Sequence, residues 1–104
     1  MPTKYRVEIT NTAETDLLEI WNYIASESTV EAAKFVLRIE EKIATLERMP
    51  FRCPAIPENA LLGTDYRHLV VDHYRVIFRL GAKRVYVLRI LHGARLLDSS
   101  SLND

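Results

Sequence analysis

The sequence predicts one α+β domain of order β-α-α-β-β-β, in which a mostly antiparallel sheet packs on an αα-hairpin. Three observations predict this fold class. Apolar and polar residues alternate in residues 5–10 and again after residue 66, apolar residues recur at helical spacing between these strands, and prolines and a glycine mark a loop over residues 49–63. With 104 residues, the chain is expected to be a single domain spanning residues 1–104.

The first strand is expected to lead directly into the first helix. Residues 5–10 place tyrosine, valine and isoleucine at alternate positions, which is typical of a strand with one buried face. Asn11 and Glu14 then form a capping pair, and the apolar stripe behind them ends near Ser26. A helix is therefore predicted between Asn11 and Ser26.

A second capping pair, Ser28 and Glu31, predicts the start of the second helix. Its apolar stripe continues toward Pro50, which cannot continue a helix because proline lacks the backbone N–H. The connection between the two helices is short, so we expect them to be antiparallel neighbours that lie together on the sheet.

Three further strands are expected after the loop, in residues 66–73, 74–80 and 85–91. A turn at residues 81–83 joins the last two strands, and the last strand is expected to be central in its sheet because it is apolar on both faces. Residues 96–104, which are rich in serine, are predicted to form a frayed tail.

The last two strands carry an unusual number of arginines. Period-2 alternation places these residues toward the core: Tyr74, Val76, Phe78, Tyr86, Leu88 and Ile90. Arg75, Arg79 and Arg89 would then emerge together on the opposite face, which is expected to be exposed and cationic. The arginines of the strand region are the candidate contacts for a partner: Arg67, Arg75, Arg79, Arg89 and Arg95.

The charges are balanced over the chain but divided along it. There are 14 basic and 14 acidic residues, with a net charge of −3 in residues 1–60 and +3 in residues 61–104. A neutral total argues against binding nucleic acid through many phosphates, because each contact needs a cation. A local cationic surface is still compatible with these numbers.

Several classes of chemistry lack the residues they require. Only three glycines are present, so no glycine-rich phosphate loop exists, and no cofactor is expected. No spacing of histidines or cysteines suits a metal, and Cys53 is the single cysteine, as in a reducing compartment. No apolar run approaches a membrane span or a signal peptide, so a cytoplasmic location without a membrane partner is expected.

Six segments, taken in order and spacing, carry a family resemblance: Tyr5-x-Val7, Ala13-x-x-Asp16-Leu17-x-x-Ile20-x-x-Tyr23-Ile24, Leu46-x-x-Met49-Pro50-x-Arg52-x-Pro54, Tyr66-Arg67-x-Leu69, Tyr74-Arg75-Val76-Ile77-Phe78 and Val87-Leu88-Arg89-Ile90-Leu91-His92-Gly93-Ala94-Arg95. Together they resemble the RelE/ParE toxins of bacterial type II toxin-antitoxin systems over almost the whole chain. The resemblance implies a growth-inhibiting toxin that a cognate antitoxin neutralises by direct binding, in a hetero-oligomer. It also implies one of two targets, since ParE-like members inhibit DNA gyrase and RelE-like members cut mRNA on the ribosome.

An RNA-cutting enzyme would need an acid, a base and cations around the phosphate. The candidates are His92 as acid or base, with Arg75 and Arg89 as cations, and His92 matches a position where several RNA-cutting relatives keep a histidine. Gly93 and Ala94 follow it, however, where those relatives commonly have an aromatic residue, and no catalytic partner is evident.

The sequence therefore favours a ParE-like toxin that inhibits DNA gyrase and has no catalytic residue of its own. Ribosome-dependent cleavage of mRNA through His92, Arg75 and Arg89 is the alternative. A folded interaction module without toxic activity is a third possibility. Whether the chain is an enzyme stays open at this point.

Overall fold

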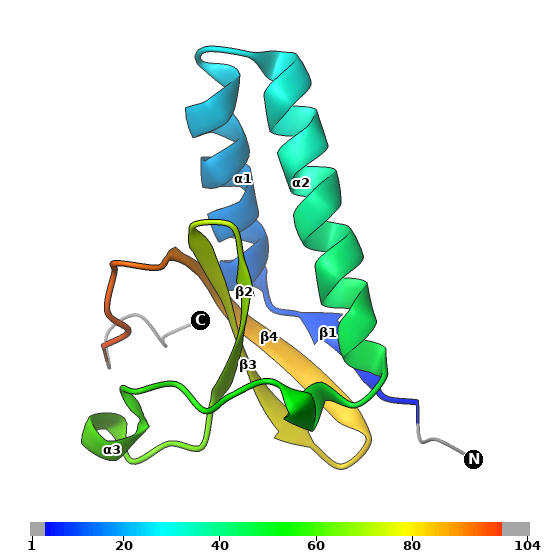
Figure 1. Cartoon of the computed structure of the whole chain (residues 1–104), viewed down its shortest axis with the longest axis vertical. Coiled ribbons are helices and arrows are strands. Elements are labelled where there is room, and N and C mark those ends of the chain that lie inside the picture. Colours follow the sequence, from blue (N-terminus) through cyan, green and yellow to red (C-terminus); the bar gives the residue numbers. More distant parts are fainter. Residues whose placement is uncertain (1–3, 99–104) are drawn as a thin grey trace.

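A long helical hairpin stands on a four-stranded sheet in the computed structural model, which describes residues 4–98 of the chain (Figure 1). The elements, in chain order, are β1 (Arg6–Ile9), α1 (Asn11–Ala25), α2 (Thr29–Ala44), the 3₁₀ turns η1 (Thr45–Glu47) and η2 (Pro50–Arg52), α3 (Asn59–Leu62), β2 (Arg67–Val71), β3 (Tyr74–Gly81) and β4 (Arg84–His92). The predicted α+β class is confirmed, and the predicted loop contains η2 and the short α3. No helix in this part of the chain is long and apolar enough to cross a membrane.

The two long helices begin with hydroxyl caps. Thr10, and not Asn11 as predicted, is the N-cap of α1, and its side chain accepts a hydrogen bond from the Ala13 N–H at 3.2 Å. Ser28 caps α2 as predicted, since its Oγ accepts from the Glu31 N–H at 3.2 Å. The second helix ends at Ala44 in a 3₁₀ turn, several residues before the proline that was expected to end it.

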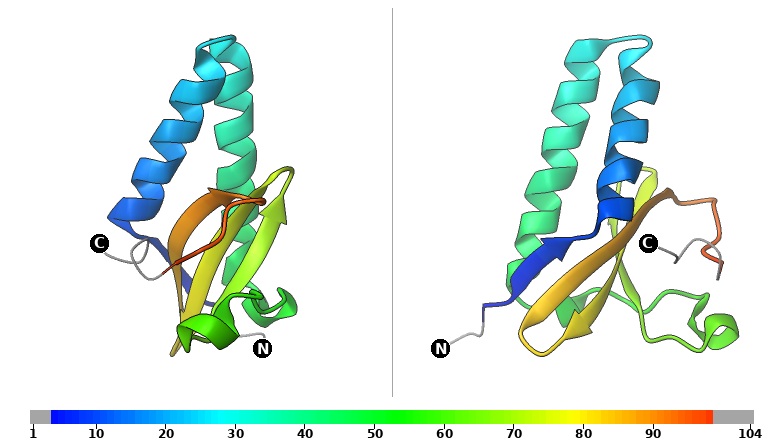
Figure 2. Two further views of the ribbon diagram at one scale, coloured as in Figure 1. Left: turned by 90° about the vertical axis from the view of Figure 1, so that its left-hand side faces the viewer. Right: turned by 180° about the vertical axis from the view of Figure 1, so that it is seen from behind.

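The strands are arranged in the order β1-β4-β3-β2, so β4 is central, as predicted. β1 runs parallel to β4, while the other two pairs are antiparallel. Seen from behind, β1 continues directly into α1 at the edge of the sheet (Figure 2). The sheet is therefore mixed, with two of its three strand pairs antiparallel.

A β-bulge in β4 changes which residues face the core. Ile77 pairs with Arg89 and Phe78 pairs with Val87, so Leu88 is an extra residue between them. Before the bulge, Val85 and Val87 point into the core, and the predicted core position of Tyr86 is wrong. After the bulge the parity is reversed, which returns Ile90 to the core as predicted.

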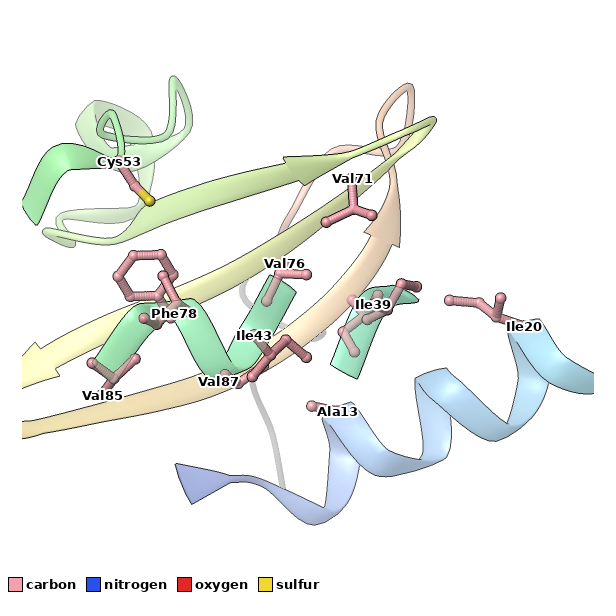
Figure 3. Close-up of a cluster of buried hydrophobic side chains, with 12 residues drawn as sticks. Ala13, Ile20, Ile39, Ile43, Cys53, Val71, Val76, Phe78, Val85 and Val87 are labelled. Carbon is pink, nitrogen blue, oxygen red and sulfur yellow. The ribbon is translucent and has the colours of Figure 1, made fainter. Parts of the chain in front are cut away.

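The main core lies between the helices and the sheet (Figure 3). Its buried members come from both helices, three strands and the adjoining turns: Ala13, Ile20, Ile39, Ile43, Leu46, Cys53, Val71, Val76, Phe78, Val85, Val87 and Ile90. At about 1.5–3 kcal/mol for each large side chain removed from water, this burial makes the hairpin inseparable from the sheet.

A second, smaller cluster covers part of the other face of the sheet. Ile77 and Leu91 project from the strands there, and Ile56 and Leu97 cover them. Leu97 is 3% exposed, so the chain is anchored at least to this residue, although the frayed tail was predicted to begin at residue 96. The remainder of that predicted tail, residues 99–104, lies outside the described residues.

Candidate functional site

Arg75 of β3 forms a buried ion pair in place of the predicted solvent-facing contact. Its two terminal nitrogens donate to the two carboxylate oxygens of Glu58, with 3.1 Å between Nη1 and Oε1. Nη2 also donates to the Arg95 carbonyl at 2.8 Å, and Nη1 lies 3.3 Å from Nδ1 of His68. The side chains of Arg75 and Glu58 are 7% and 6% exposed, so this guanidinium is not available to a partner.

Glu58 joins three separate segments of the chain. It precedes α3, pairs with Arg75 of β3, and accepts a hydrogen bond from the Leu97 N–H at 3.0 Å. The hydrogen bonds from Arg75 are the main reason why the pKa of Glu58 falls to about 2 despite its burial. Nε of Arg75 is buried and has no hydrogen-bond partner in residues 4–98, which makes the pair still more dependent on the Glu58 carboxylate.

The lowered pKa predicts an acid-sensitive contribution to stability. Glu58 titrates near 2 in the folded chain and at its ordinary value of 4.5 when unfolded, so its charged form favours folding above pH 4.5 and this contribution is lost as the pH falls toward 2. The shift corresponds to about 3 kcal/mol at pH 7, of which about 2 kcal/mol should disappear between pH 5 and pH 3. Urea unfolding at pH 5 and at pH 3 should show that Glu58→Gln loses less free energy of unfolding between these values than the wild-type protein does. Equal losses in the two proteins would contradict the role assigned to Glu58.

Arg89 of β4 is held in the same way by Asp16 of α1. Its Nε and Nη2 donate to the two carboxylate oxygens at 2.8 and 2.9 Å. Asp16 also accepts the backbone N–H of Ile90 at 2.8 Å, at a position where β1 no longer pairs with β4. The Asp16 carboxylate thus accepts a backbone hydrogen bond that a neighbouring strand would otherwise accept, and it fixes α1 to the sheet.

The prediction that Arg75 and Arg89 are exposed is therefore wrong. Both arginines do lie on the predicted face of the sheet. Arg75 pairs with Leu91 and Arg89 pairs with Ile77, and these two partners belong to the second cluster, away from the main core. Each then meets a carboxylate from a distant part of the chain, since Glu58 lies 17 residues before Arg75 and Asp16 lies 73 residues before Arg89. Neither partner was identified from the sequence, although Asp16 stands three residues after Ala13 beside the apolar stripe of α1.

The other candidate arginines differ in their surroundings. Arg67 is partly buried, and its Nη1 donates to the carbonyls of Phe51 and Cys53, so it holds the loop before α3 to β2. Arg79 is exposed, and its guanidinium carbon lies 4.0 Å from the centroid of the Tyr86 ring. Arg95 is exposed beyond the end of β4. Their role as partner contacts stays a prediction.

His92 lies at the exposed end of β4. Its Nδ1 accepts the Ala94 N–H at 3.2 Å, and its ring packs edge-on against Tyr74 and parallel to His73, with centroids 5.6 and 6.4 Å away. A shallow cavity of about 190 Å³ adjoins it, and its polar lining residues are Asp16, Glu19, Tyr23, Tyr74, His92 and Arg95. One nitrogen of His92 is thus used by the backbone, and the nearby aspartate is already paired with Arg89.

No group of three or more histidine, cysteine, aspartate or glutamate side chains in residues 4–98 has a geometry that could hold an ion. The thiol of Cys53 is buried in the main core, where burial raises its pKa, so it is a poor nucleophile.

Comparisons with known proteins place this arrangement in a family. The family model described as the ParE toxin of the type II toxin-antitoxin system parDE matches residues 7–97. Comparison with curated proteins gives no match.

Solved structures with the same fold include chains from two toxin-antitoxin systems. A chain of the chromosomal ParDE system from P. aeruginosa is 22% identical, with a TM-score of 0.69 over 86% of this chain and 97% of that one. A chain of the toxin-antitoxin complex RelBE2 from Mycobacterium tuberculosis is 24% identical, with a TM-score of 0.56 over 89% of this chain and 95% of that one. The match to the family model spans most of the sequence, and the chain therefore belongs to the ParE toxin family of type II toxin-antitoxin systems.

Proposed function

We propose that this chain inhibits bacterial growth by binding DNA gyrase in the cytoplasm, and that a cognate antitoxin neutralises it by direct binding in a hetero-oligomer. Membership of the ParE toxin family supports the toxin role. The observation that carries the choice of mechanism is that Arg75 and Arg89 are both committed to buried carboxylates. A toxin that acts by binding its target has no need of free catalytic cations.

Cleavage of RNA has requirements that this geometry meets poorly. The phosphate in the transition state needs cations that reach it, and a cation neutralised by a buried carboxylate cannot stabilise a second anion. Arg75 already donates to Glu58 and to a backbone carbonyl, and Arg89 donates to Asp16. An enzyme that used them would have to break ion pairs that hold the fold together.

Ribosome-dependent cleavage of mRNA is nevertheless the second candidate, because of one feature of the structure. His92 is exposed beside Tyr74 and lines the same shallow cavity as Arg95 and Tyr23. An imidazole can act both as an acid and as a base, so such a side chain is suited to proton transfer. The two candidates make different predictions for this residue.

We predict that His92→Gln leaves toxicity nearly unchanged. Glutamine keeps a polar side chain of similar length but cannot exchange a proton at neutral pH, so an enzyme would lose about 10²- to 10⁴-fold in rate. The measurement is growth inhibition on induced expression without antitoxin, with thermal unfolding as the check that the variant folds. A folded variant that no longer inhibits growth would favour the nuclease.

The target can be identified in the same cells. Gyrase inhibition should induce the DNA-damage response and filamentation, and coexpression of the antitoxin encoded beside the toxin should reverse both. Rapid arrest of translation with cut messages would show the alternative activity, and unchanged growth would show an inactive member of the family.

A further inference from the structure

Within residues 4–98, only one half of the sheet face that points away from the helices is covered by other segments. The second hydrophobic cluster covers the half near Ile77 and Leu91. The other half lies beside the turn between β3 and β4. There the register places Arg6 beside Arg84 and places both Glu8 and Arg79 beside Tyr86, on the side opposite the core valines. We call these five residues the hairpin face.

The hairpin face carries more positive than negative charge. Nη1 of Arg84 donates to Oε1 of Glu8 at 2.6 Å, and Nε of Arg6 lies 3.8 Å from the same oxygen. The side chains of Arg6 and Arg84 are 73% and 42% exposed, and Arg79 is also exposed. The hairpin face thus holds three guanidinium groups and one carboxylate, which contacts Arg6 and Arg84. Lys83 in the adjoining turn adds a further positive charge.

Two contacts fix the centre of this face. The guanidinium of Arg79 lies over the Tyr86 ring at 4.0 Å, in cation–π geometry. Gly81, which lies on β3 with Arg79, lets the Tyr86 ring approach the β3 backbone closely. A Cβ at this position would be only 3.1 Å from Cε2 of Tyr86. The ring and the arginine are thus held by their neighbours, which lowers the entropy lost when a partner binds.

We propose that the hairpin face binds an acidic, extended segment of the cognate antitoxin, an inference that rests on the proposed neutralisation by direct binding. Guanidinium groups bind carboxylates through paired hydrogen bonds, and Arg6, Arg79 and Arg84 all have donors that Glu8 does not use. In the free chain Glu8 orients the cations of β1 and β4, and the antitoxin adds carboxylates to the remaining donors.

Nucleic acid suits this surface less well than an acidic peptide. Arg79 covers a face of Tyr86, so the ring offers less surface on which a base could stack. Glu8 lies among the cations and would repel a row of phosphates, and the few cations present would release few counterions. Isolated carboxylates of a peptide can instead be spaced to meet each arginine separately.

The test is a charge reversal measured with the antitoxin that copurifies from the native operon. The double variant Arg79→Glu/Arg84→Glu should slow association with the antitoxin by on the order of 10- to 100-fold, and it should remove most of the dependence of the association rate on salt. Glu8→Gln should have the opposite effect and increase the rate of association with the antitoxin by roughly 2- to 5-fold.

The matched control is Lys34→Glu/Lys42→Glu on α2, which changes the net charge equally at exposed positions away from the hairpin face. Thermal unfolding shows whether each variant folds. A folded double arginine variant that remains toxic but is no longer rescued by the antitoxin supports the proposal. Association rates equal to those of the lysine control would overturn it.

Two further outcomes separate this inference from the function on which it rests. If the double arginine variant binds antitoxin normally but loses toxicity, the hairpin face contacts the target and the inference is wrong, while neutralisation by binding stands. If nothing copurifies from the operon and coexpression does not rescue growth, both the inference and the proposed neutralisation fail.

Discussion

Asp16→Ala should lower the free energy of unfolding by about 3–5 kcal/mol, because it leaves the Arg89 guanidinium buried without its carboxylate. The side chains of Arg89 and Asp16 are 10% and 7% exposed, so water replaces the lost contacts only in part. The backbone N–H of Ile90 also loses its acceptor. A domain of this size is stable by about 5–15 kcal/mol, so the variant should unfold at a much lower temperature or fail to accumulate.

The control for this prediction is Glu19→Ala in the same helix, because Glu19 is exposed. Its removal should change the free energy of unfolding by no more than about 0.5 kcal/mol. The measurement is chemical denaturation of both variants at pH 7. A similar small change in both would show that the pair between α1 and β4 contributes little to the fold.

Glu58→Ala is the second substitution with a large expected effect. It removes both side-chain oxygens that neutralise Arg75 and also the acceptor of the Leu97 N–H. We again expect a loss of about 3–5 kcal/mol, since a buried cation remains without its partner. In contrast to Asp16→Ala, the change should first loosen the chain after β4, because the Leu97 N–H in this segment loses its acceptor.

Hydrogen exchange distinguishes this local effect from global unfolding. The Leu97 amide should exchange much faster in Glu58→Ala, while amides in the centre of β4 should keep more of their protection. Asp65→Ala, an exposed acidic residue that follows α3, is the matched control and should leave both regions unchanged. Unchanged protection of Leu97 in Glu58→Ala would contradict the role assigned to this carboxylate.

The elements of this fold could be predicted from sequence because each depends on neighbouring residues. The apolar stripes of α1 and α2, the cap at Ser28 and the alternation in β3 are local patterns, and they predicted the order and the class correctly. The faces of β4 could not be predicted, because the extra residue at Leu88 reverses the alternation and is visible only in the pairing with β3.

The candidate site was harder to predict for a related reason. An arginine in a strand is equally compatible with solvent exposure and with a buried carboxylate, and the choice is made by residues far away in the sequence. Glu58 and Asp16 reach Arg75 and Arg89 only after the loop and α1 have packed on the sheet. The cations that remain at the surface beside the last hairpin are Arg79, which is exposed, and Arg84, which is partly buried. The bulge in β4 separates them from Arg75 and Arg89.

The buried ion pairs with Glu58 and Asp16 give two of the predicted contact arginines a structural role. Arg75 and Arg89 stabilise the fold, and the exposed guanidinium groups are the ones available to a protein partner. Under the proposed function, this toxin acts through binding alone.

The most direct test compares the purified protein in two reactions, supercoiling by DNA gyrase and translation of a defined mRNA on ribosomes. We expect the wild-type protein and His92→Gln to inhibit supercoiling equally and to leave the mRNA intact. Cleavage of the mRNA by the wild-type protein, lost in His92→Gln and accompanied by normal gyrase activity, would contradict the account.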